Sequence, residues 1–141
     1  MDWYEGLLRT RAAVNLVLDD VEHEVGTDVV RIEFEEAGKL RLGGPHAEIV
    51  GAKTRIALGG DLTAAPWEYF VSRTAQDIQE IVQETCDRLF PRCPEHEYHA
   101  MNAEPDRGVA SWRCPGGTFT VAIGALGEPE PIDDPTGSGG S

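Results

Sequence analysis

The residues between Cys93 and Pro115 are the part of this chain whose types and spacing are best suited to binding a metal ion. Cys93 and His96 are separated by two residues, and Cys114 follows in a segment that is expected to form a hairpin. Zinc in proteins is commonly held by four tetrahedral ligands, chiefly cysteine sulfur and histidine nitrogen. The sequence therefore predicts a zinc site whose first three ligands are Cys93, His96 and Cys114.

The spacing does not fix the fourth ligand. His99, in the same short segment, is the preferred candidate and would complete a Cys2His2 site, while Glu95, Glu97 and water are the alternatives. A metal-free loop is the other interpretation of this stretch. In that case Cys93 and Cys114 would be buried thiols or an oxidised pair, and the two histidines would be surface residues.

The same stretch resembles half of a zinc ribbon. CPEH at residues 93–96 is similar to the first knuckle of that family, and CPGG at residues 114–117 is similar to a second knuckle without its last ligand. Gly117 stands where a complete ribbon has Cys or His. The resemblance is confined to residues 93–117, and it implies a structural zinc there.

A reactive metal is the alternative to a structural one. Catalytic zinc keeps one position for water and has a base nearby, for which Glu95, Glu97 and Glu104 are the candidates. The signatures of zinc deaminases and of HExxH enzymes do not occur, and neither does the GxSxG elbow that carries a nucleophilic serine. We therefore predict no catalytic residues, with a small zinc-dependent hydrolase or deaminase-like enzyme as the alternative.

Two helices, a meander and a hairpin are expected to position these residues. Apolar residues at helical spacing predict helices over residues 3–25 and 63–90, and alternation with a period of two predicts three or four antiparallel strands over residues 28–62. A second alternating pattern predicts a hairpin over residues 110–123. The predicted fold class is α+β: helix, three- to four-stranded antiparallel meander, long helix, and a C-terminal β-hairpin fastened by zinc.

Length and composition favour one folded domain with a tail. A chain of 141 residues suits a single core, which we expect to span residues 1–126, with 91–126 as a zinc-knuckle and hairpin subregion. Residues 127–141 are acidic and carry too little apolar surface to fold, so we predict that they are disordered. Their last five residues, GSGGS, resemble an expression linker.

Charge and hydropathy exclude some classes of partner. The net charge of −13 argues against general nucleic-acid binding, which depends on cations that neutralise phosphates. No apolar run approaches the roughly 18 residues of a membrane-spanning helix, and the opening residues lack the basic charge of a secretory signal. Three cysteines cannot all pair within the chain. We expect a cytoplasmic protein without a membrane partner.

The expected function is that of a protein-binding or assembly module. Arg31, Arg41 and Arg55 lie in residues 29–60, where charge is balanced, and arginine favours interfaces, so they are the candidate binding face. The order helix, meander, helix also resembles that of small acidic secretion-chaperone-like domains, which implies binding of another protein and dimerisation. We predict a protein partner of unknown identity, with a homodimer as a further expectation. An acidic inhibitor or nucleic-acid mimic is the alternative.

Overall fold

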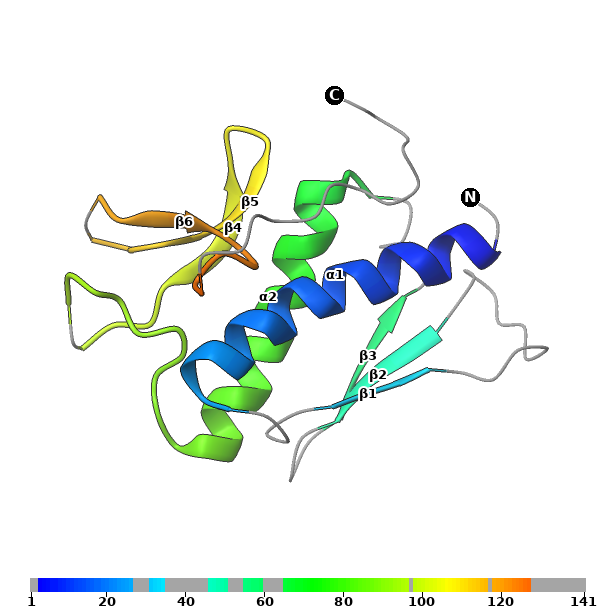
Figure 1. The fold of residues 1–141 in the computed structure, drawn as a ribbon, viewed down its shortest axis with the longest axis horizontal. Coiled ribbons are helices and arrows are strands. Elements are labelled where there is room, and N and C mark those ends of the chain that lie inside the picture. Colours follow the sequence, from blue (N-terminus) through cyan, green and yellow to red (C-terminus); the bar gives the residue numbers. More distant parts are fainter. Residues whose placement is uncertain are drawn as a thin grey trace.

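Over the residues that the structure describes, the fold consists of two helices and two small antiparallel sheets, and the helix pair lies between the sheets (Figure 1). The computed structural model describes the backbone of residues 3–26, 31–34, 46–50, 55–59, 65–96, 98–116 and 118–127. It describes the side chains of residues 5–6, 8–26, 65–96, 98–116 and 118–127.

The first half of the chain follows the predicted order. Helix α1 (Trp3–Glu24) leads into a sheet of three antiparallel strands in the order β1-β2-β3, and helix α2 follows (Figure 1). The bounds of the three strands and of the second helix are β1 (Arg31–Phe34), β2 (His46–Val50), β3 (Arg55–Gly59) and α2 (Trp67–Cys86). The predicted α+β class and the antiparallel meander are confirmed.

Helix α2 is shorter than predicted at both ends. It begins after Pro66, whose fixed backbone angle suits a helix start, and no side chain caps it there. It ends before Asp87, which adopts a left-handed conformation with φ of 52°, and such a residue commonly terminates a helix. The helical spacing of apolar residues continued to residue 90 in the sequence because Phe90 is also buried. Phe90, however, reaches the core from the loop after the helix.

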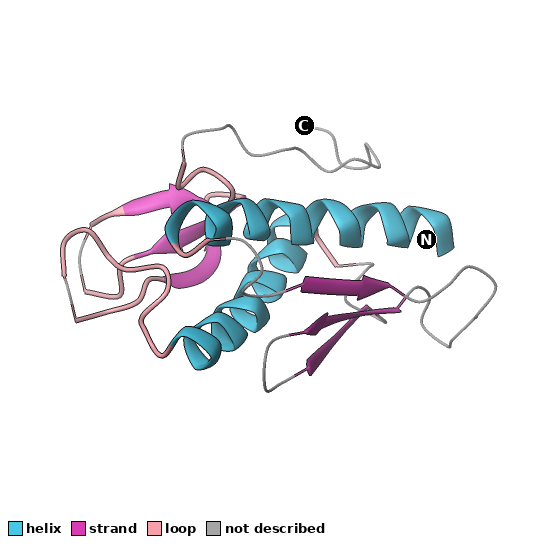
Figure 2. Ribbon diagram, turned by 60° about the horizontal axis from the view of Figure 1, so that its bottom comes forward, coloured by secondary structure: helices cyan, strands magenta, loops and turns pink. Residues whose placement is uncertain are grey.

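The C-terminal hairpin belongs to a second sheet, which is separate from the first in Figure 2, and its strands are in the order β4-β5-β6. Its bounds are β4 (Asn102–Asp106), β5 (Val109–Arg113) and β6 (Thr120–Ala122). The sequence analysis missed β4, because NAEPD contains few residues that favour strands and includes Pro105. Proline is tolerated there because β4 is at the edge of its sheet.

Buried apolar side chains of both helices and the second sheet form the core. Trp112 of β5 is fully buried, and its ring meets that of Phe90 edge to face with centroids 5.7 Å apart. Phe70, Ile78 and Val82 of α2 are fully buried as well. Burial of this many large apolar side chains is the main stabilising contribution to the fold.

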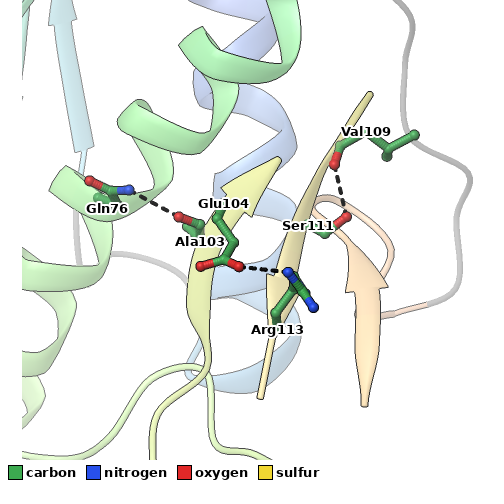
Figure 3. A network of polar contacts seen from close by, with 6 residues as sticks. All are labelled: Gln76, Ala103, Glu104, Val109, Ser111 and Arg113. Carbon is green, nitrogen blue, oxygen red and sulfur yellow. Dashed lines mark hydrogen bonds and ion pairs between the residues drawn. The ribbon is translucent and has the colours of Figure 1, made fainter. Parts of the chain in front are cut away.

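Glutamines of α2 hold the chain that leads to the predicted metal ligands. Gln76 Nε2 donates to the carbonyl of Ala103 over 2.9 Å (Figure 3), and Gln79 Nε2 donates to the carbonyls of Phe90 and Met101 over 2.8 Å and 2.6 Å. Strand β4 thus has its outer edge bonded to a helix. The segments on both sides of the metal-ligand loop are fixed to α2.

Some predictions fall on parts of the chain that are not described. Arg41, Glu97, Gly117 and the tail beyond residue 127 lie outside the described residues. Arg31 and Arg55 lie in β1 and β3, where both pair with Val50 of the central strand, and their side chains are outside the description. Within the described ranges, no helix combines the length and apolarity needed to cross a bilayer.

Candidate metal centre

Two loops carry the predicted ligands, and the backbone amide of a cysteine closes each one. The N–H of Cys93 donates to the carbonyl of His99 over 3.1 Å, and the N–H of Cys114 donates to the carbonyl of Phe119 over 3.0 Å. The first loop follows α2, and the second joins β5 to β6. Each cysteine is therefore placed at the base of its loop by a main-chain hydrogen bond.

The three predicted ligands converge. Cys93 Sγ, a ring nitrogen of His96 and Cys114 Sγ all lie within 4.8 Å of one another. His96 Nδ1 is 3.7 Å from Cys93 Sγ and 3.1 Å from Cys114 Sγ. A tetrahedral zinc with ordinary bond lengths would separate a nitrogen and a sulfur ligand by about 3.6 Å. The donor set and its spacing therefore fit a metal ion, with Nδ1 as the histidine ligand.

The two cysteines differ in their acidity. Burial raises the pKa of the Cys93 thiol, but hydrogen bonds from His96, Cys114 and the backbone of Glu95 and His96 lower it, and the net direction is down. Burial raises the pKa of Cys114, and the hydrogen bond and charge of Cys93 raise it further. Cys93 is therefore the more acidic of the two thiols. Binding of a metal to both sulfurs would displace the thiol protons.

Glu95 joins the two loops. Its Oε1 accepts hydrogen bonds from the backbone amides of Phe119 and Thr118 over 2.7 Å and 3.1 Å, and its Oε2 accepts one from Thr118 Oγ1 over 3.4 Å. This residue was an alternative fourth ligand and a candidate base. In the structure its carboxylate is directed to the backbone of the second loop.

His99 lies beside the three converging ligands. Its ring is 5.4 Å from that of His96, centroid to centroid, in an edge-to-face arrangement, and its side chain is exposed. It does not belong to the group of atoms that lie within 4.8 Å of one another. Its role as fourth ligand stays a prediction.

The third cysteine, Cys86, and the candidate base Glu104 lie outside the converging group. Cys86, at the end of α2, is half-buried, packs against the core and is not part of the converging group. Glu104 of β4 accepts a hydrogen bond from Arg113 over 2.8 Å on the sheet surface (Figure 3). Neither supplies an atom to the candidate metal centre.

The sequence analysis missed two acidic residues of α1 that support this region. Asp20 accepts a hydrogen bond from Trp112 Nε1, and Glu24 Oε1 accepts one from the amide of Arg92, next to Cys93. Burial raises the pKa of both carboxyls. Their spacing of four places them on one face of the helix, and this could have indicated that they share a buried role.

Comparison with known proteins gives no relative, because no family model, curated protein or solved structure matches this chain. The chemistry of the site must therefore be inferred from its own geometry. Two thiols and an imidazole suit zinc and other borderline or soft metals better than calcium or magnesium, which prefer oxygen ligands. What the site can do is hold such an ion between two loops.

Proposed function

We propose that Cys93, His96 and Cys114 bind one structural zinc ion, and that the domain so fastened is a non-enzymatic protein-binding or assembly module. The observation that carries the zinc proposal is the convergence of three ligand atoms from two loops that close separately. A metal bound there would cross-link the segment after α2 to the β5–β6 turn. Structural zinc acts in this way in small domains.

His99 is our proposed fourth ligand. Its ring already lies beside that of His96 and is exposed, so rotation of its side chain would disturb no core packing. Four protein ligands characterise structural zinc, whereas catalytic zinc keeps a water-filled position. A Cys2His2 centre would therefore fasten the loops without reacting.

The surroundings of the site support a structural role over a catalytic one. A catalytic zinc needs a base that can reach the bound water. Of the candidate bases that the structure describes, Glu95 accepts hydrogen bonds from the second loop and Glu104 pairs with Arg113. Both carboxylates are therefore engaged in hydrogen bonds or ion pairs with other groups of the protein.

Elemental analysis combined with hydrogen exchange tests the zinc proposal. We expect about one zinc per chain in purified protein, and we expect Cys93→Ser and Cys114→Ser to lose it. Cys86→Ser is the matched control and should retain the metal, because Cys86 lies outside the converging group. Removal of zinc should speed exchange across residues 91–126 and leave α1 and α2 protected. Unchanged exchange in the metal-free protein would refute a fastening role.

The protein-binding part of the proposal rests on charge. The chain is strongly acidic, and residues 29–60 are its balanced segment, where Arg31, Arg41 and Arg55 offer cations. Charge reversal at these three arginines should abolish most of the recovery of co-purifying proteins in a pull-down. Charge reversal at the exposed Arg11 of α1 is the control and should leave recovery unchanged. An equal loss of recovery in both variants would refute the arginine face as the binding surface.

A further inference from the structure

We infer that Glu95 is a positioning residue of the zinc site, and this inference rests on the zinc binding proposed above. Glu95 lies in the first loop between two ligands, Cys93 and His96. Its carboxylate reaches the second loop and accepts two backbone hydrogen bonds and one from a hydroxyl there. The second loop carries the third ligand at its base. One side chain thus ties together the two loops that a single ion must join.

The geometry of these bonds shows which atom matters most. Both backbone amides donate to Oε1, over 2.7 Å from Phe119 and 3.1 Å from Thr118, while Oε2 receives only the longer 3.4 Å contact from Thr118 Oγ1. Hydrogen bonds from amides to a carboxylate are stronger than those between neutral groups. Oε1 therefore holds the second loop at a set distance from the first.

This contact should prepare the site for the metal. If the loops were independent, zinc binding would have to order them, and the free-energy cost of that ordering would weaken the binding. Because Glu95 bonds to Phe119, whose carbonyl also accepts from the Cys114 amide, the position of Cys114 is linked to that of Glu95. Residues that support metal ligands in this way contribute about 10- to 100-fold to metal affinity.

Glutamine separates the hydrogen bonds of Glu95 from its charge. It has nearly the same shape, keeps an oxygen at the Oε1 position for both amides, and offers an NH2 group that can donate to Thr118 Oγ1. Glu95→Gln therefore preserves the positioning contact, whereas Glu95→Ala removes it.

Zinc titration with a competing chelator, followed by the visible spectrum of the Co²⁺-substituted protein, tests the inference. We expect Glu95→Ala to weaken zinc binding about 10- to 100-fold and to alter the Co²⁺ spectrum. We expect Glu95→Gln to bind zinc within a few-fold of wild type, with an unchanged spectrum. Glu22→Ala, at an exposed position of α1, is the control for loss of one surface acid.

The other outcomes are distinguishable. If Glu95 were itself the fourth ligand, Gln would weaken binding and shift the spectrum as Ala does, and the positioning role would be refuted. If Glu95→Ala bound zinc like wild type, the positioning role would also be refuted while the zinc site stood. If wild-type protein bound neither zinc nor Co²⁺, the proposed function itself would fail.

Discussion

Strand β6 is held at its two ends by carboxylates that come from distant parts of the chain. Before the strand, Glu95 accepts hydrogen bonds from the amides of Thr118 and Phe119. After the strand, Asp20 of α1 accepts hydrogen bonds from the amides of Gly124 and Leu126 over 2.6 Å and 3.0 Å. Both residues supply acceptors for backbone groups that the short strand leaves without partners in its sheet.

The environments of the two carboxylates differ. The side chain of Asp20 is 0% exposed and also accepts a 2.7 Å hydrogen bond from Trp112 Nε1 in the core, whereas Glu95 is exposed. Water can replace Glu95 as an acceptor, but it cannot readily reach the groups that Asp20 serves. The same hydrogen-bonding pattern therefore stabilises the fold at the buried Asp20 end of the strand and only positions a loop at the exposed Glu95 end.

The largest expected effect is that of Asp20→Ala on stability. The substitution leaves buried donors of Trp112, Gly124 and Leu126 without an acceptor, and each such orphan costs about 1–3 kcal/mol. We expect the free energy of unfolding of zinc-free protein to fall by on the order of 3 kcal/mol in urea denaturation. Glu95→Ala, measured in the same way, should lower it by about 0.5 kcal/mol or less because its donors face water.

Asp19→Ala is the matched control for Asp20, since it removes the exposed neighbouring acid from the same helix. Its free energy of unfolding should stay close to that of wild type. If Asp20→Ala and Glu95→Ala lowered the free energy of unfolding equally, burial would not be what distinguishes the two carboxylates.

A smaller effect is expected in the pH dependence of stability. Burial raises the pKa of Asp20 above its ordinary value of 3.8, against the opposing effect of its hydrogen bonds to Gly124, Trp112 and Leu126. The folded state therefore holds the Asp20 proton more tightly than the unfolded state. Its contribution to stability is fully present below pH 3.8 and is lost as the pH rises through the raised folded-state pKa.

Urea denaturation of wild type and Asp20→Asn, both free of zinc, measures this contribution between pH 3 and 7. The stability of wild type relative to the variant should decline with rising pH and then level off. Other acids with raised pKa values, such as Glu24, are present in both proteins and cancel in the difference. A relative stability that increases with pH would mean that the three hydrogen bonds outweigh burial.

The sequence by itself determined the order of the elements apart from β4, and the three residues that converge in the candidate site. Periodicity separates helical from extended segments because side chains repeat every 3.6 or every 2 residues. The short spacing of Cys93 and His96 places them together in any tight loop, and the alternation before PGG places Cys114 at the base of a hairpin. These features depend on neighbours in the chain, so local patterns could predict them.

Only the tertiary structure decided the roles of β4, Glu95 and Asp20. Strand β4 forms because α2 and β5 satisfy its two edges, despite a sequence that does not favour strands. Glu95 and Asp20 look like ordinary surface acids, and their partners lie at least 23 and at least 92 positions away in the sequence. A carboxylate can accept a hydrogen bond from any backbone amide. Its partner is therefore set by which backbone groups the fold brings within reach and shields from water.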